Sequence, residues 1–278
     1  MHFSFSYALP LLLLSLASGA SHGEQLPRWE IGAGLATLNL PDYRGSDERT
    51  TYLLPMPYVV YRGEYLRADR EGLRGVLFED ERIQLNLSLN GTLPVSDRRN
   101  AARAGMEGLN PTVEIGPTLD VTLWRAADQR SKLDLRLPVR GAITVEGSPS
   151  HIGWLAYPNL LYTVDAPFGM QGWNMGWVLG SYFSNRRYNT YFYSVAPRYA
   201  TTDRSAYDAR GGYGGSQLTW SVSRRFPRYW VGAFARYDTL RGAVFEDSPL
   251  VRERDAFSVG IAISWIFRIS SSTVEAQD

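Results

Sequence analysis

The feature that most constrains the fold is a strict alternation of side chains in residues 256–267. The odd positions carry large apolar residues, and the even positions carry mostly Ala, Ser and Gly. A period of two residues is that of a β-strand, because successive side chains point to opposite faces. The large apolar face and the small opposite face suit a strand with hydrocarbon on one side and a crowded lumen on the other. A strand of a soluble sandwich shows the same alternation, so the rest of the chain has to decide between the two.

Three segments in the middle of the chain, 83–90, 112–123 and 132–146, alternate in the same way, with apolar residues on one face and polar or charged residues on the other. In a soluble sandwich the charged face would meet bulk water and need no partner. In a barrel it faces the lumen, where opposite charges must pair to offset the loss of hydration. The acids and bases on this face balance, which predicts a lumen charge network of Glu114, Asp120, Lys132, Asp134, Arg136 and Arg140.

Alternation along the whole chain defines the number of strands. Eleven clear strands begin near residues 29, 51, 65, 82, 112, 132, 151, 173, 213, 229 and 256. Bacterial single-chain barrels have an even number of strands, so a twelfth is expected, with residues 188–199 as its source; merging one hairpin to give ten is the alternative. Aromatic residues gather near the strand ends, as in interfacial girdles. The sequence therefore predicts an all-β fold, a transmembrane antiparallel β-barrel of twelve strands.

The first residues of the chain predict export. Residues 1–17 are apolar and rich in Leu, and the small residues Ala17-Ser18-Gly19-Ala20 follow them. This is the pattern of a secretory signal, with cleavage expected after Ala20 or, alternatively, after Gly23; a buried N-terminal helix is the competing interpretation. We therefore expect a signal peptide in residues 1–20, an outer-membrane β-barrel in residues 21–267 and a disordered tail in residues 268–278.

Composition excludes several classes of function. The chain has 29 basic and 28 acidic residues and a net charge of +1, so a nucleic-acid partner is not expected. The absence of Cys removes disulfides, thiolate metal sites and Cys nucleophiles. Beyond residue 20 the histidines are His22 and His151, and His151 is assigned to a turn, where a solvated residue is a simpler interpretation than a catalytic base. With no metal-ligand spacing either, we predict a protein that is not an enzyme and has no cofactor and no metal.

Short motifs spread over nearly the whole chain after residue 20 carry a family resemblance. They include Gly32-x-Gly34, Pro55-x-Pro57-Tyr58, Tyr191-Phe192-Tyr193-Ser194-Val195 and the loop Asp247-Ser248-Pro249-Leu250-Val251. Together they resemble the MipA/OmpV family, named for the MltA-interacting protein. The most specific element is the loop with Asp247, Ser248 and Pro249 before the closing strand. The chain departs from the family pattern at Ser194, where Gly is usual, and in the 11 residues that follow Phe267.

The resemblance implies a location and a function. Members of this family are outer-membrane barrels, so the chain is expected in the outer membrane of a bacterial cell, in contact with outer-membrane lipid. It further implies a scaffold that links murein-remodelling enzymes to that membrane, with a murein lytic transglycosylase and a murein synthase as partners. The alternatives are a narrow pore for small solutes and a surface adhesin that uses the loop 185–210. A pore is disfavoured because so few strands leave a narrow interior, which long inward side chains fill.

The closing strand resembles the C-terminal signal by which bacterial outer-membrane barrels are recognised for insertion. In the segment Ser258-x-Gly260-x-x-Ile263-x-Trp265-x-Phe267, an apolar face ends in an aromatic pair. We therefore expect an insertion signal made of Gly260, Ile263, Trp265 and Phe267. Because residues follow Phe267, this signal would be read internally and not at the terminus.

Overall fold

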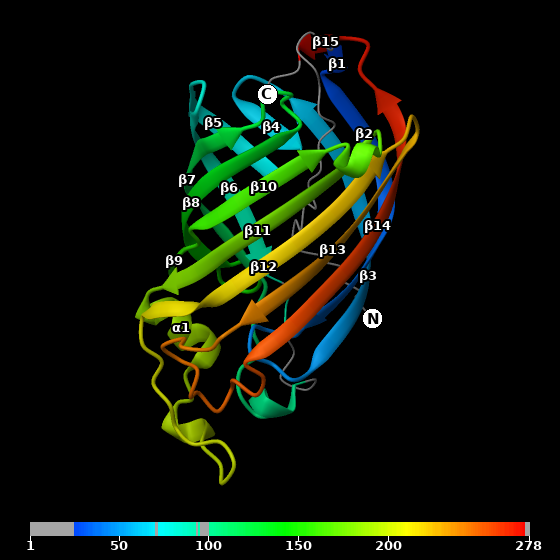
Figure 1. Ribbon diagram of the computed structural model, residues 1–278. Coiled ribbons are helices and arrows are strands. Elements are labelled where there is room, and N and C mark those ends of the chain that lie inside the picture. The colour runs from blue at the N-terminus through cyan, green and yellow to red at the C-terminus, as the bar shows by residue number, and fades with distance from the viewer. Residues whose placement is uncertain (1–24, 70–71, 93, 95–99, 276–278) are drawn as a thin grey trace.

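The structure, a computed structural model, describes residues 25–69, 72–92, 94 and 100–275. The segment 1–20, which the sequence assigns to a signal peptide, lies outside these residues, as do residues 276–278 at the end of the predicted tail. Thirteen of the 15 strands in the described chain belong to one antiparallel sheet that closes on itself (Figure 1).

The barrel wall consists of long strands joined to their neighbours in sequence order. In that order they are β2 (Trp29–Pro41), β3 (Arg49–Arg62), β4 (Leu66–Asp69), β5 (Gly72–Glu79), β6 (Ile83–Thr92), β7 (Thr112–Arg125), β8 (Ser131–Thr144), β9 (His151–Ala156), β10 (Asn159–Asp165), β11 (Trp173–Ser184), β12 (Gly212–Arg225), β13 (Tyr229–Thr239) and β14 (Asp255–Ile269). The wall closes where β14 pairs with β2. β9 and β10 run in line, since both pair antiparallel with β8 on either side of Pro158. The 13 strands of the sheet therefore form a barrel of twelve, which confirms the predicted fold.

The twelfth strand has a different origin from the one expected. Residues 65–79, assigned to one strand, form the hairpin of β4 and β5, in which Arg67 pairs with Arg74. Residues 188–199, the expected source, instead form helix α1 (Arg186–Tyr193) and a 3-10 turn (Pro197–Tyr199). The helix forms because the Asn185 side chain accepts a hydrogen bond from the backbone N–H of Tyr188, which caps its first turn.

Helical structure is otherwise short. The remaining helical elements are 3-10 turns at η1 (Ala101–Arg103) and η2 (Pro167–Gly169), in addition to η3 (Pro197–Tyr199). Within the part of the chain that the structure describes, no helix has the length and apolar character needed to cross a membrane.

The two ends of the barrel differ. At the terminal end, β1 (Gln25–Pro27) pairs with β15 (Thr273–Glu275), so both ends of the described chain lie together (Figure 1). The predicted disordered tail is therefore ordered through residue 275: β14 continues to Ile269, and the Ser270 N–H donates to the Trp29 carbonyl at 2.9 Å. These interstrand hydrogen bonds pair the backbone groups of the tail. The polar sequence of the tail gave no indication of this pairing. The opposite end, which carries the long connections 100–111, 185–211 and 240–254, is named the loop end.

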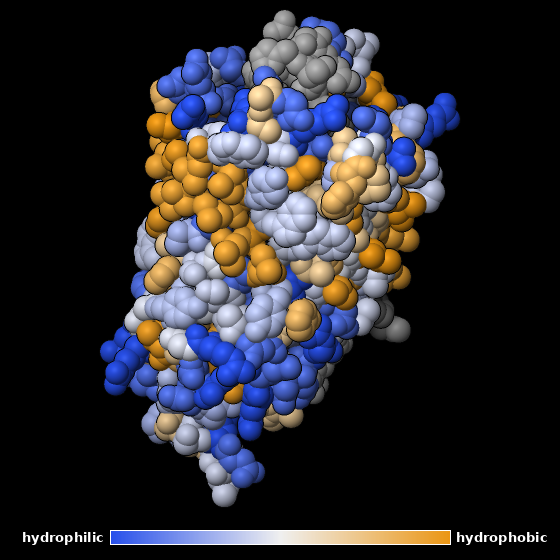
Figure 2. All heavy atoms as spheres, in the orientation of Figure 1, coloured by the Kyte–Doolittle hydropathy of each residue, from blue (hydrophilic) through white to orange (hydrophobic). Residues whose placement is uncertain are grey.

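The outer surface of the wall is apolar. Between Ala256 and Phe267 of β14 the exposed residues are Phe257, Val259, Ile261, Trp265 and Phe267, whereas Ala256, Ser258, Ala262, Ser264 and Ile266 are buried. Leu53 of β3 and Ile261 are 69% and 64% exposed. Figure 2 shows apolar side chains gathered on the wall and hydrophilic ones at the two ends. A continuous apolar band of this kind is the surface that a barrel presents to lipid.

Candidate functional site

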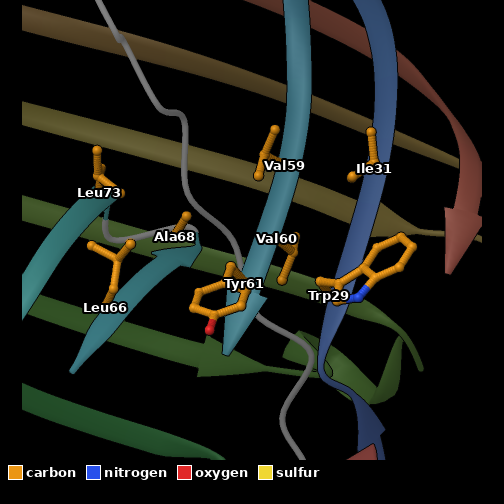
Figure 3. A pocket seen from close by; sticks show the side chains of 8 residues that line it. All are labelled: Trp29, Ile31, Val59, Val60, Tyr61, Leu66, Ala68 and Leu73. Atoms are coloured by element: carbon orange, nitrogen blue, oxygen red, sulfur yellow. The ribbon is translucent and has the colours of Figure 1, made fainter. Parts of the chain in front are cut away.

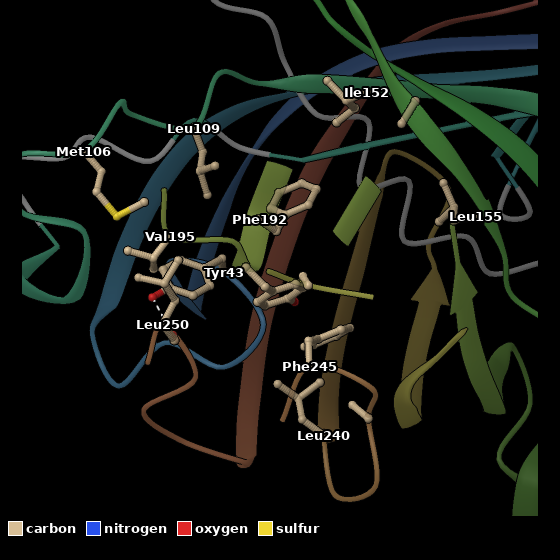
Figure 4. Close-up of a cluster of buried hydrophobic side chains, with 14 residues drawn as sticks. Tyr43, Met106, Leu109, Ile152, Leu155, Phe192, Val195, Leu240, Phe245 and Leu250 are labelled. Carbon is tan, nitrogen blue, oxygen red and sulfur yellow. Dashed lines mark hydrogen bonds between the residues drawn. The ribbon is translucent and has the colours of Figure 1, made fainter. Parts of the chain in front are cut away.

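The lumen is closed at the loop end by a cluster of apolar side chains, here named the cap. Its segments are the loop 42–48, residues 100–111, α1 with the loop 194–211, and the loop 240–254, packed on the ends of β8 and β9. Figure 4 shows the side chains of these separate segments converging. The buried members are Tyr43, Met106, Leu109, Ala142, Ile152, Leu155, Phe192, Tyr193, Val195, Ala209, Leu240, Ala243, Phe245 and Leu250.

The family-motif loop lies in this cap. The Ser248 hydroxyl donates to the Tyr193 carbonyl at 2.7 Å, and the Tyr43 hydroxyl donates to the Leu250 carbonyl at 2.7 Å. Leu250 is fully buried. Of the three residues predicted to mark the loop, Ser248 makes the contacts, Pro249 is half-buried, and the Asp247 side chain is 83% exposed. The loop thus fastens α1 to the loop 42–48.

Burial raises the pKa of two tyrosines in the cap. The Tyr193 ring stacks on Phe245 with centroids 3.7 Å apart, and its hydroxyl donates to the Arg44 carbonyl at 3.0 Å. Burial raises the pKa of Tyr193 to about 12 and also raises the pKa of Tyr43 above its ordinary value, because the charged phenolate would lose its hydration. Both rings therefore stay uncharged to a higher pH than an exposed tyrosine, whose pKa is about 10.

Buried arginines attach the loop 194–211 to the rest of the cap. Arg204 donates to the carbonyls of Ala102 and Ala104 at 2.9 and 3.0 Å. Arg103 donates to the Phe192 carbonyl at 2.9 Å. The predicted adhesin loop, residues 185–210, is thus built into the closure of the barrel.

Beneath the cap, a pair of arginines converges on one acid. Arg44, from the loop 42–48, reaches Asp238 of β13 at 3.1 Å and donates to the Gly214 carbonyl at 2.8 Å. Arg236 reaches the other oxygen of Asp238 at 2.7 Å, and the Arg44 guanidinium lies 4.2 Å from the centre of the Tyr182 ring. The sequence analysis did not predict this cluster of Arg44, Arg236 and Asp238. The one indication in the sequence was that Asp238 occupies an inward-facing position of β13.

The six residues of the predicted lumen charge network all lie on the inner face of β7 and β8. Asp120 pairs with Arg136 at 2.9 Å, and Lys132 pairs with Asp134 at 3.2 Å. The Glu114 carboxylate, 2% exposed, accepts hydrogen bonds from the Tyr188 hydroxyl and the Asn90 amide, both at 3.1 Å. Arg140 donates to the Ser88 hydroxyl at 3.0 Å. The structure thus brings four of the six into ion pairs, while Glu114 and Arg140 hydrogen-bond to neutral groups and attract each other at longer range.

A second cluster of charges lies inside the lumen at the terminal end, on β2, β3 and β12. Glu30 of β2 is 1% exposed and contacts Arg62 of β3 at 3.2 Å and Arg225 of β12 at 2.7 Å. The Tyr58 hydroxyl also lies 3.4 Å from Glu30. The partners Glu30 and Arg225 are 195 residues apart in sequence, so alternation gave no sign that they meet.

Between these charged groups, the inner faces of β2, β3, β13 and β14 carry two small apolar clusters, one around Ala36, Trp230 and Ala262 and one around Leu38, Leu40 and Phe234. Trp230 and Phe234 turn inward from β13 and lie over glycines of the wall. A Cβ on Gly232 would come within 2.4 Å of the Trp230 ring, and one on Gly260 within 2.3 Å of the Phe234 ring. Of the predicted insertion signal, Gly260 therefore faces the lumen, while Ile263, Trp265 and Phe267 lie on the outward parity.

The described residues offer no assembled catalytic or metal site. His151, assigned from the sequence to a turn, is the first residue of β9, and its ring meets the edge of the Trp154 ring with centroids 5.5 Å apart. Its Nε2 is buried without a hydrogen-bond partner among those residues. No group of three His, Asp or Glu side chains in the described chain is placed to hold a metal ion.

Comparison with known proteins identifies the family. A sequence model of the family described as MltA-interacting protein MipA matches residues 32–267. The chain belongs to this family. The MipA family and the closed barrel place the protein in the bacterial outer membrane. No curated protein matches this MipA-family chain in sequence.

Solved structures with a similar shape are distant in sequence. One is described as a bacterial polysaccharide outer membrane secretin, with 10% identity, a TM-score of 0.43, and coverage of 86% of this chain and 99% of that one. Another is a NanC porin, with 10% identity, a TM-score of 0.40, and coverage of 84% and 98%.

Proposed function

We propose that this MipA-family barrel is a non-conducting, non-catalytic scaffold that holds a murein lytic transglycosylase at the outer membrane. The observation that carries the proposal is the closure of the lumen. The cap fills one end, and at the other end Glu30 pairs with Arg62 and Arg225 inside the lumen. Solutes cannot pass through a closed lumen, so we assign the function to the surfaces at the two ends.

The terminal end is the surface that we assign to the partner. Short turns and both termini of outer-membrane barrels face the periplasm, where murein lies. At this end Phe168, in the turn between β10 and β11, is 92% exposed. Both Phe168 and Ala166 have left-handed backbone, with φ of 54° and 49°. Strained backbone of this kind persists where the surrounding structure holds it, and here it presents an aromatic side chain away from the barrel. The family description supports a transglycosylase as the partner, and a murein synthase would join through the same assembly.

Capture of the enzyme tests the scaffold. The full chain, solubilised from membranes, should retain a purified murein lytic transglycosylase, and Phe168→Ser should weaken that retention. Tyr199→Ser, at the loop end, is the matched control and should leave it unchanged. If the parent chain retains no transglycosylase, the scaffold assignment fails.

Conductance separates the scaffold from the pore. In planar bilayers the full chain should pass no steady current, because the cap obstructs the lumen. Regular single-channel steps would instead support a narrow pore.

A further inference from the structure

The outer face of the barrel carries one apolar groove that the scaffold does not use. It has a volume of about 420 Å³ and lies where β2 and β3 meet the short hairpin of β4 and β5 (Figure 3). This size falls within the range of about 300–1,000 Å³ that is common for small-molecule sites. Its lining residues are Trp29, Ile31, Val59, Val60, Tyr61, Leu66, Ala68 and Leu73.

The groove opens outward, toward lipid. Residues paired across neighbouring strands point to the same face, and Tyr61 pairs with Trp29 on one side and with Ala68 on the other. Ala68 in turn pairs with Leu73. Ile31 and Leu66, which share this face, are 46% and 49% exposed. The alternate positions on β3, β4 and β5 carry arginines that face the lumen.

The hollow exists because the wall is poor in side chains here. β3 has 14 residues, but its register with β4 comprises Tyr61 and Arg62. Ala68 is small, and Gly75, the partner of Leu66, has no side chain; a Cβ there would meet its nearest neighbours only at 3.9 Å. An empty hollow facing hydrocarbon forfeits dispersion contacts, and water does not enter from the lipid side. An acyl chain of a neighbouring lipid is therefore its natural occupant.

A cation beside the groove gives it a preference among lipids. Arg268 of β14 is exposed and is the register partner of Ile31, so it lies on the same outward face. Arg268 forms no ion pair with another residue in the described part of the chain. Arg62, by contrast, is held by Glu30. Guanidinium groups at the level of interfacial aromatic residues are placed to meet a lipid phosphate.

We propose that this groove binds one anionic phospholipid, with an acyl chain along Ala68 and Leu73 and its phosphate against Arg268. The lipid belongs to the leaflet at the terminal end of the barrel. The site does not depend on the scaffold function, because it lies on the wall and not on the end that is assigned to the partner.

Lipid retention tests the site. The full chain, purified in detergent, is mixed with dioleoyl phosphatidylglycerol or dioleoyl phosphatidylcholine, and native mass spectrometry counts the bound lipids. One phosphatidylglycerol should be retained at least about fivefold more than phosphatidylcholine, and Arg268→Gln should lower its occupancy about fivefold, as expected for one cation near an anionic headgroup. Ala68→Trp, which fills the groove, should abolish the retained copy. Inorganic phosphate alone should not displace the lipid, because it lacks the chain.

Matched variants make the result specific. Arg228→Gln removes an exposed cation from another turn of the same end, and Val259→Trp places the same large side chain at another outward strand position; both should leave occupancy unchanged. If Ala68→Trp does not fold, the lipid occupancy of Arg268→Gln decides the test. Because the Arg268 side chain is exposed, its replacement should not prevent folding. Equal retention of the two lipids, or equal occupancy in Arg268→Gln and Arg228→Gln, would overturn the proposal.

Discussion

The cap and the barrel wall place apolar residues in opposite ways. In the cap, Phe245, Leu240 and Leu250 are buried, as in a soluble protein. In the wall, Leu53 and Ile261 are more than 60% exposed, and the interior holds ion pairs. The two regions therefore suit two different solvents. The cap buries its apolar side chains away from water, whereas the wall exposes its apolar side chains to lipid hydrocarbon. Four comparisons of variants or conditions sharpen this contrast.

Truncation of apolar side chains should have unequal effects in the two regions. Leu250→Ala leaves a cavity in the cap and should lower its unfolding free energy by about 2–5 kcal/mol. Ile261→Ala on the wall should cost far less, because lipid moves into the space. Protease sensitivity of the loops in vesicles measures the effect of Leu250→Ala, and urea unfolding of the barrel in the same vesicles measures the effect of Ile261→Ala. Equal losses of unfolding free energy in the two variants would contradict the difference between cap and wall.

Charge should be tolerated on the outside of the cap and not on the wall. Ile261→Arg places a cation in hydrocarbon, which costs about 2–4 kcal/mol near the bilayer midplane. Thr202→Arg, on the exposed part of the loop 194–211, should change little. The folded fraction, read from the difference in gel mobility between boiled and unboiled samples, reports both. A wall that tolerates Ile261→Arg as readily as the loop tolerates Thr202→Arg would not face lipid.

Alkaline pH should open the cap before the wall. The folded pKa of Tyr193, about 12, lies above the unfolded value of about 10, so its contribution is complete below pH 10 and is lost as pH rises through 12. The loss is on the order of 2 kcal/mol. Phenolate absorbance and loop proteolysis should rise together in that window, while the barrel remains folded. Tyr193→Phe should shift the loop transition to higher pH.

Assembly should depend on the closing strand more than on the terminal ladder. We propose that Trp265 and Phe267 are read during insertion, so Phe267→Ala should reduce the membrane-inserted amount severalfold. Deletion of residues 273–278 removes β15 and its pairing with β1. This deletion should change the inserted amount least, because the β1–β15 ladder lies beyond the barrel. The inserted amount of each variant in the outer-membrane fraction decides; normal insertion of Phe267→Ala would reject the signal.

The sequence by itself determined the wall. Alternation is a local property, because the two faces of a strand are fixed by the backbone of each residue and its neighbours. Residues 112–146 alone therefore showed which side chains face outward, and which six charges face the lumen. The closing strand and its outward aromatic residues followed in the same way.

Tertiary structure decided which groups meet. Glu30 contacts Arg225, 195 residues away in sequence, and Arg44 contacts Asp238, 194 residues away. Closure of the barrel brings these pairs together, and no local sequence pattern encodes it. The same holds for the cap, where Ser248 meets α1, and for the terminal ladder, where polar residues gain order from a distant strand. It also holds for the groove, whose floor depends on where the β4–β5 hairpin stops against β3. Side-chain direction is local, but contact depends on the register of strands far apart in sequence.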